Sequence, residues 1–365
     1  MRVQTMIIFN NYQRVSFILI FLVVLFTASP KVYGDDSSFF TKTKDKIISW
    51  VQDHQTKNKS IIIKPTREEI ISYIKTKRES NYAINISSDI GTNLSGLNLS
   101  GINFSGANMY KVDLSRSDIS NSNFRNAFLE QAVLDYAIAS EVDFSHASMA
   151  LVSARHTKFN GVIFDQAYGH EINFSDGVIS DCSFDSANLR HANFMNAVID
   201  DTAFKNTTIE GANFSNSNIN ATEFINVKLQ NSKFDQTNIT KVKLQDSYMN
   251  NLNMTKVKIT GGSIVSTSLV NSKLDQTEFS NVQLIFTDFS KSDITKSFLK
   301  GVTIDSSIFE NANIAETNFL LADILSSEFT ETNFIKTKFI SSRIKGVKLN
   351  FASLPEVELS NTFIQ

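Results

Sequence analysis

The sequence predicts an all-β solenoid, a rod in which the chain turns a corner every five residues. Large apolar residues recur from Leu94 to Ile364 in steps of five, which gives 55 consecutive repeats without an insertion. Two positions before each of these centres lies a small or β-branched residue in most repeats. A helix would spread a five-residue period around its surface, and a strand would alternate the centres between its faces. We therefore expect four repeats to form one square coil, with residue n stacked on residue n+20.

The same stacking makes a prediction about the core, because the four centres of one coil share its interior and their volumes must compensate. One column of centres reads Phe104, Phe124, Phe144, Phe164, Phe184, Phe204 and Phe224. The coil that contains Phe159 and Phe164 also contains the small centres Ala154 and Gly169. We expect large and small centres to compensate there, with a residual cavity as the alternative.

Residues 1–34 are typical of a secretory signal peptide. MRVQTMIIFNNYQR contains two arginines and no acidic residue, and VSFILIFLVVLFTA is a 14-residue apolar run that is short for a membrane span. Val32 and Gly34 occupy the positions expected before cleavage between Gly34 and Asp35. An uncleaved signal-anchor is the alternative. Cys182 is the only cysteine, so an exported product would have no intramolecular disulfide.

Residues 35–91 are expected to form a small helix, strand and helix that cap the solenoid. FFTKTKDKIISWVQDHQ has apolar residues near helical spacing, and SIIIKP resembles a short strand that ends at a proline. Thr66 with Glu69 forms a capping box at the start of the second helix. Its predicted apolar stripe is Ile70, Ile71 and Ile74. We find no catalytic constellation in this segment.

The repeat resembles that of the pentapeptide-repeat family. Its motif is an alanine-like residue, Asp or Asn, a large apolar residue and two variable residues, as in ANMYK, VDLSR, SDISN, ANLRH, ANFMN, ANFSN and SDITK. The resemblance covers residues 92–365 and implies a right-handed quadrilateral β-helix. With coils about 4.8 Å apart, the roughly 14 coils would form a rod about 65 Å long.

Two groups of polar side chains could suggest chemistry. Stacking gathers one group at a corner, namely His170, Glu171, Arg190 and His191. We interpret it as a solvated charge ladder and not as a metal or acid–base site, because no second carboxylate or ligand spacing closes it. A second column contains Tyr136, His156 and Asp176, and is expected to be a ladder of the same kind. Cys182 occupies a small inward position and is interpreted as a packing residue. We predict no catalytic residue, metal or cofactor.

The outward position before each centre is usually polar, and its exceptions suggest an interaction patch. The exceptions are Phe128, Val133, Ile138, Ile163 and Tyr168, and Tyr136, which lies between Val133 and Ile138, completes the set of candidate residues. Contiguous exposed apolar surface often marks an interface, so we predict a protein partner that the sequence does not identify. The alternative is that the chain departs from the regular square here and these side chains fill in, or pack under the N-terminal segment.

The last repeats end in VELSNTFIQ without a predicted helix after them. An open edge of a solenoid favours edge-to-edge association. We therefore expect a homodimer, or docking of another chain, through Phe363 and Ile364.

Charge and export limit the functional class. The chain has a net charge of −2, and residues 92–365 carry 22 Lys and Arg against 29 Asp and Glu, so we expect no nucleic-acid partner. The leading interpretation is a non-enzymatic exported scaffold for protein–protein interaction, periplasmic or secreted if bacterial. It would meet the membrane only during export or through an uncleaved signal-anchor. A secreted effector acting on another cell is an open case of this class.

The resemblance also implies a different class, a DNA-mimicking modulator of a type II topoisomerase. Modest acidity, scattered lysines and the export signal disfavour it. An enzyme with its active site in residues 35–91 is disfavoured by that segment's small size and by its lack of a nucleophile and base.

Overall fold

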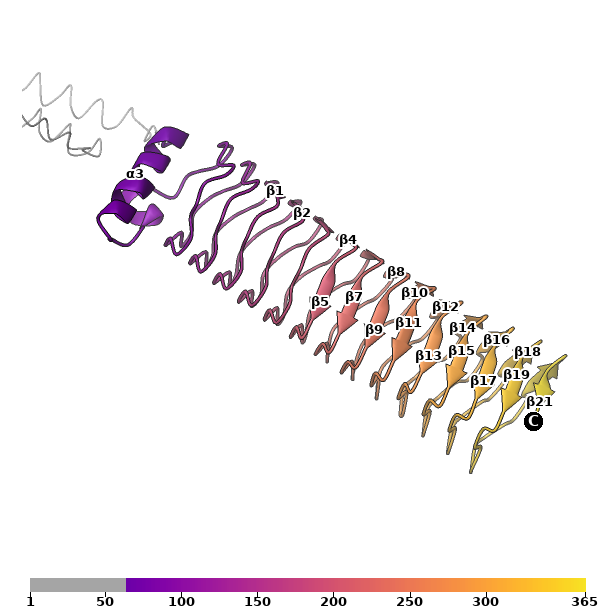
Figure 1. Cartoon of the computed structure of the whole chain (residues 1–365). Helices are drawn as coiled ribbons and strands as arrows, with labels where there is room; N and C mark the ends of the chain where they lie inside the picture. Colours follow the sequence, from indigo (N-terminus) through magenta and orange to yellow (C-terminus); the bar gives the residue numbers. More distant parts are fainter. Residues whose placement is uncertain (1–63) are drawn as a thin grey trace, which may run out of the picture. The chain divides into compact units, whose positions relative to one another are not determined.

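The computed structural model describes residues 64–365 (Figure 1). Lys64–Gln365 is one compact unit, a parallel β-solenoid preceded by a small helical segment. The predicted signal peptide, the predicted first helix and most of the SIIIKP strand lie outside the described residues.

Two sides of the coil form parallel sheets. The 12-stranded sheet contains β1 (Ile138–Ser140), β2 (Lys158–Asn160), β3 (Val178–Ser180), β4 (Val198–Asp200), β6 (Asn218–Asn220), β8 (Asn238–Thr240), β10 (Lys258–Thr260), β12 (Glu278–Ser280), β14 (Phe298–Lys300), β16 (Asn318–Leu320), β18 (Lys338–Ile340) and β20 (Glu358–Ser360). The 9-stranded sheet contains β5 (Ala203–Lys205), β7 (Glu223–Ile225), β9 (Lys243–Gln245), β11 (Ser263–Val265), β13 (Gln283–Ile285), β15 (Thr303–Asp305), β17 (Asp323–Leu325), β19 (Arg343–Lys345) and β21 (Phe363–Ile364).

The register steps by 20 residues, as the five-residue period predicted. Ile138 pairs with Lys158 at one end of the 12-stranded sheet, and isolated parallel bridges continue the same step on the other sides of the coil. Bridges from Asn98 to Asp118 and from Asp118 to Ile138 add two levels to this sheet, which agrees with the predicted number of coils.

The corners have a common backbone conformation. The residue two positions after each centre has a positive φ, between 44° and 69° at the corners from Gly96 to Asn361. This left-handed conformation costs little for Gly and is tolerated by Asn and Asp, which explains why these residues recur there. Each corner lets the next centre point back into the coil, so that both inward positions of a repeat are buried.

Short polar side chains satisfy the backbone around each corner. Asn or Asp before a centre accepts a hydrogen bond from the N–H two residues later, as from Ser115 to Asp113 at 2.8 Å. Ser or Thr at the small inward position donates to a carbonyl of the preceding coil, as from Thr237 Oγ1 to Phe214 O at 2.8 Å. These bonds explain how hydroxyl groups can be buried in the core.

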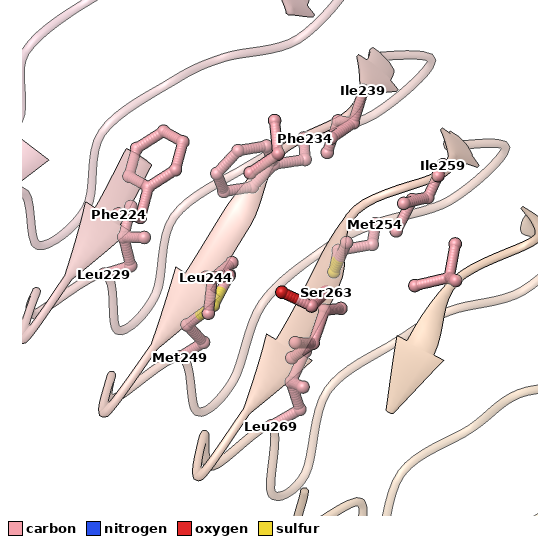
Figure 2. A pocket seen from close by; sticks show the side chains of 14 residues that line it. Phe224, Leu229, Phe234, Ile239, Leu244, Met249, Met254, Ile259, Ser263 and Leu269 are labelled. Carbon is pink, nitrogen blue, oxygen red and sulfur yellow. The ribbon is translucent and has the colours of Figure 1, made fainter. Parts of the chain in front are cut away.

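The predicted phenylalanine column is confirmed. From Phe104 to Phe224 successive rings stack with centroids 4.6–5.3 Å apart. Where Ala154 and Gly169 are the small centres, Phe159 meets the Phe164 ring edge-on at 5.3 Å. A Cβ at Gly169 would lie 2.9 Å from Leu189 Cδ2, so large and small centres compensate there. The cavity shown in Figure 2 lies farther along the rod, among residues 224–282.

The helix α3 (Arg67–Glu79) lies at the first coil. Its predicted capping box is present, with Thr66 Oγ1 accepting from the Glu69 N–H at 3.2 Å and the Glu69 carboxylate accepting from the Thr66 N–H at 2.8 Å. Ile70 and Ile74 are buried, whereas Ile71 is 42% exposed, so the predicted stripe was wrong at Ile71. Residues four apart share a helix face, but one step of 100° turns Ile71 toward solvent.

Polar contacts fasten α3 to the backbone of the first coil. Arg67 donates to the Asn98 carbonyl at 2.9 Å, and Arg78 donates to the Asn103 carbonyl at 3.1 Å. After α3, residues 84–86 pair with Asn108 and lead into the short π-helix η1 (Ile86–Ile90). The four centres of the first coil are fully buried: Leu94, Leu99, Phe104 and Met109.

Candidate interaction surface

The outer surface of the rod pairs opposite charges between neighbouring coils. Arg190 Nε lies 3.0 Å from Glu210 Oε2, Lys338 Nζ lies 2.8 Å from Glu358 Oε2, and Arg343 pairs with Asp323. Such exposed pairs stabilise a protein by at most about 1 kcal/mol each. They balance the acidic side chains along the rod, so no continuous acidic column forms at these levels.

The corner at His170 differs from the sequence prediction in one contact, which is that of Arg190. His170 Nδ1 lies 3.5 Å from Glu171 Oε1, and the His170 ring meets the His191 ring edge-on at 5.5 Å. Arg190 pairs instead with Glu210 of the next coil. Among residues 64–365 no group of three or more His, Cys, Asp or Glu side chains could hold a metal ion.

The predicted column at Tyr136 is a stacked ladder. The Tyr136 and His156 rings are parallel with centroids 4.6 Å apart, and the Arg116 guanidinium lies 5.5 Å from the Tyr136 centroid. His156 Nε2 lies 4.0 Å from Asp176 Oδ2, and Asn196 donates to the same carboxylate at 2.9 Å. Five coils therefore present one row of aromatic and polar groups on the surface.

Cys182 is a packing residue in the structure. Its side chain is buried at the small inward position and its thiol donates to the Ser180 carbonyl at 3.1 Å. Burial raises the pKa of the Cys182 thiol to about 12, so it stays protonated and unreactive at neutral pH.

The six residues of the predicted patch lie on different sides of the coil. Phe128 and Tyr168 belong to one column, separated by Ser148. Val133 lies in the next column and is half-buried, and Ile138 lies in the 12-stranded sheet. Tyr136 occupies the corner between these two, and Ile163 lies in the remaining column. They do not form one continuous patch, because the register places consecutive repeats on successive sides.

A more compact group forms on the side that contains Phe128. Four large side chains on this side and at its corner lie within four consecutive coils and are 41–53% exposed: Tyr110, Phe128, Leu151 and Tyr168. The Tyr168 ring is nearly parallel to the His170 ring, with centroids 6.3 Å apart. We call these four residues the aromatic face. With coils about 4.8 Å apart, it spans about 14 Å along the rod.

Sequence reasoning missed Tyr110 and Leu151 because, apart from Tyr136, it considered only the outward position before each centre. Tyr110 follows a centre by one position, and Leu151 occupies the corner between the column of Phe128 and the column of Val133. Leu151 also has a φ of 59°, a conformation that is uncommon for a large apolar residue. A bulky residue at a corner was the sequence feature that could have revealed Leu151.

The last coil differs from all the others in exposure. Its centres are 42–57% exposed: Leu349, Leu354, Leu359 and Ile364. Phe363 is 59% exposed beside Ile364 in β21, the last strand of its sheet. This coil therefore presents apolar side chains together with unpaired strand edges.

Within residues 64–365 the structure contains no helix with the length and apolar character needed to cross a membrane.

A coil of four five-residue segments with a stacked apolar core defines a parallel β-solenoid of the four-sided kind. The chain belongs to the pentapeptide-repeat family, as its sequence resemblance indicated. A family model described as Pentapeptide repeat region matches residues 137–214, and one described as Pentapeptide repeats (8 copies) matches residues 90–126, 113–150 and 265–301. No protein of curated function matches the sequence.

Similar solved structures include HetL, a pentapeptide repeat protein involved in heterocyst differentiation regulation from the cyanobacterium Nostoc sp. strain PCC 7120. It has 14% identity and a TM-score of 0.23, with 63% of this chain and 88% of that chain covered. QnrB1, a plasmid-mediated fluoroquinolone resistance protein, has 15% identity and a TM-score of 0.26, with 50% and 90% covered. The A-module of the Azotobacter vinelandii mannuronan C-5 epimerase AlgE6 has 10% identity and a TM-score of 0.22, with 82% and 95% covered. Likenesses at this level carry no argument about function.

Proposed function

We propose that the protein is a non-enzymatic scaffold that binds another protein through the aromatic face. The supporting observation is that four large side chains are exposed within four consecutive coils, along one side and its corner: Tyr110, Phe128, Leu151 and Tyr168. Large aromatic side chains are the usual anchors of protein interfaces, since they bury much apolar area and lose little conformational entropy. The stacked coils hold these anchors at fixed spacing, so a partner meets a preformed surface.

Crosslinking in cells of the source organism tests this proposal. A photo-crosslinking residue replaces Phe128, and a control protein carries it at Tyr248, which lies in the same column and is 53% exposed outside the aromatic face. We expect a specific adduct from position 128 and none from position 248. Tyr168→Ser should abolish that adduct. Equal adducts at both positions, or none at 128, contradict the proposal.

We further propose that the protein acts outside the cytoplasm, on the basis of the signal peptide that the sequence predicts before Asp35. Fractionation followed by N-terminal sequencing tests this. The expected product begins at Asp35 outside the cytoplasm. A full-length chain in the cytoplasm would overturn the proposal and would favour a DNA-mimicking role. The ion pairs between coils offer that role no support, because they place Lys and Arg beside the acidic side chains.

The apolar centres of the last coil support a homodimer through this end of the rod. Two copies would cover Leu359, Phe363 and Ile364 and pair the edges of β20 and β21. Sedimentation velocity should show a dimer, and the double variant Phe363→Asp/Ile364→Asp should sediment as a monomer. A monomeric wild-type protein, or a dimer that withstands the double substitution, excludes this mode of association.

A further inference from the structure

The core changes composition in the middle of the rod. One column of stacked rings ends with Phe204 on Phe224, and a second ends with Phe214 on Phe234, whose centroids are 4.7 Å apart. Stacking resumes between Phe289 and Phe309, with centroids 4.9 Å apart. The eight centres between Phe234 and Phe279 contain no aromatic residue: Ile239, Leu244, Met249, Met254, Ile259, Ile264, Leu269 and Leu274. We call residues 239–274 the phenylalanine-free section.

A cavity of about 30 Å³ lies in this section (Figure 2). Its lining includes Phe224, which is the last ring of the phenylalanine column, and four residues that follow it: Leu244, Met249, Met254 and Ile264. Leu and Met do not fill the space that stacked rings fill in neighbouring coils. Its lining is almost entirely apolar, and apolar cavities stay dry, so no water replaces the missing contacts.

The wall of the rod is also distorted beside the cavity. Gly262 occupies a small inward position, and it is the one such position between Ile102 and Ser342 that is exposed. It follows the corner Gly261 with a second positive φ, of 83°, which interrupts the regular spacing of corners. A Cβ at Gly262 would collide with the carbonyl oxygen of Val242, so the backbone there requires glycine.

We propose that the phenylalanine-free section is a compliant joint that divides the rod into two cooperatively folded parts. The stability of a solenoid is approximately a sum of contacts between neighbouring coils, and it opens first where that sum is smallest. Three features weaken these contacts here: the missing ring stacks, the cavity and the Gly262 distortion. Flexible methionine side chains resist bending less than stacked rings do. The aromatic face and the last coil lie on opposite sides of this joint, so bending there changes their relative orientation.

Hydrogen exchange of the full chain, followed by mass spectrometry, tests the joint. Ladder amides in residues 239–274 should exchange on the order of tenfold faster than the equivalent amides in 199–234 and 279–314. Protection in the section that equals or exceeds protection in both flanking segments would overturn the proposal.

A matched pair of variants links the effect to the cavity. Leu244→Phe adds a ring against the void, whereas Leu284→Phe makes the same change in the same column at a residue that does not line the void. Leu244→Phe should slow exchange across residues 239–274 and raise the denaturant midpoint, and Leu284→Phe should lower the midpoint. The proposal fails if both variants respond alike. If Leu244→Phe does not fold, the wild-type exchange profile alone decides.

Discussion

The two ends of the described rod differ in how far the four core centres of a coil are buried. In the first coil the centres are completely buried, because α3 and residues 84–86 lie against them. In the last coil the corresponding centres are about half exposed. Leu99 and Leu359 make the comparison direct, since they belong to the same column. Stacking within the solenoid therefore buries a centre only when another layer covers it.

The largest effect is expected from a charge placed under the cap. Ile70→Asp would bury a carboxylate against the first coil, so α3 should detach, at a cost of about 3 kcal/mol. The neighbouring change Ile71→Asp places the same charge in solvent and should cost less than about 0.5 kcal/mol. Chemical denaturation of both variants measures the difference. Similar costs would mean that α3 does not protect the first coil.

Truncating matched leucines compares the two ends themselves. Leu99→Ala removes a fully buried side chain and should reduce the free energy of unfolding by about 3 kcal/mol. Leu359→Ala, at 53% exposure, should cost less than about 1 kcal/mol in the monomer. The free energy of unfolding should be measured at protein concentrations low enough to keep the chain monomeric. Equal losses would indicate that something covers the last coil in solution.

A smaller effect is expected at the start of α3. Thr66→Ala removes the side-chain acceptor of the capping box and should destabilise the helix by about 1 kcal/mol. Thr66→Ser keeps the hydroxyl and serves as the control. Hydrogen exchange should localise the loss to α3 and the first coil, and leave the last coil unchanged.

The smallest effect concerns pH at the same end. Hydrogen bonds from Ser88 and Lys77 hold the pKa of Asp89 below its usual value of 3.8, and Tyr73 donates to the same carboxylate at 2.8 Å. A lowered folded-state pKa stabilises the protein above the unfolded pKa, and this contribution is lost as pH falls through the folded value. Wild type should thus exceed Asp89→Asn in stability above pH 3.8 and lose that advantage below it. Denaturation midpoints of both proteins across this range test the expectation.

The inward half of this molecule could be predicted from sequence, and the outward half only in part, as at the ladder of Tyr136 and His156. The five-residue period determines which side chains enter the core and which coil each one meets, so the phenylalanine column followed directly. Outward positions obey no such packing rule, so the sequence did not indicate that Tyr110 and Leu151 are exposed in the same stretch of coils as Phe128. The cavity near Leu244 was not predicted either. Rings can turn edge-on beside Ala154, whereas aliphatic centres of ordinary size leave a void near Leu244.

Because the chain turns a corner at every fifth residue, each repeat turns the direction of the next side by a quarter turn. Inserting twenty residues in phase would lengthen it by one coil, about 4.8 Å, without turning any side chain to a new direction. Inserting five would rotate everything downstream by a quarter turn relative to the aromatic face. One inserted residue would instead exchange inward and outward positions in every later repeat. Length and direction can therefore vary in units of whole repeats, while the core is preserved.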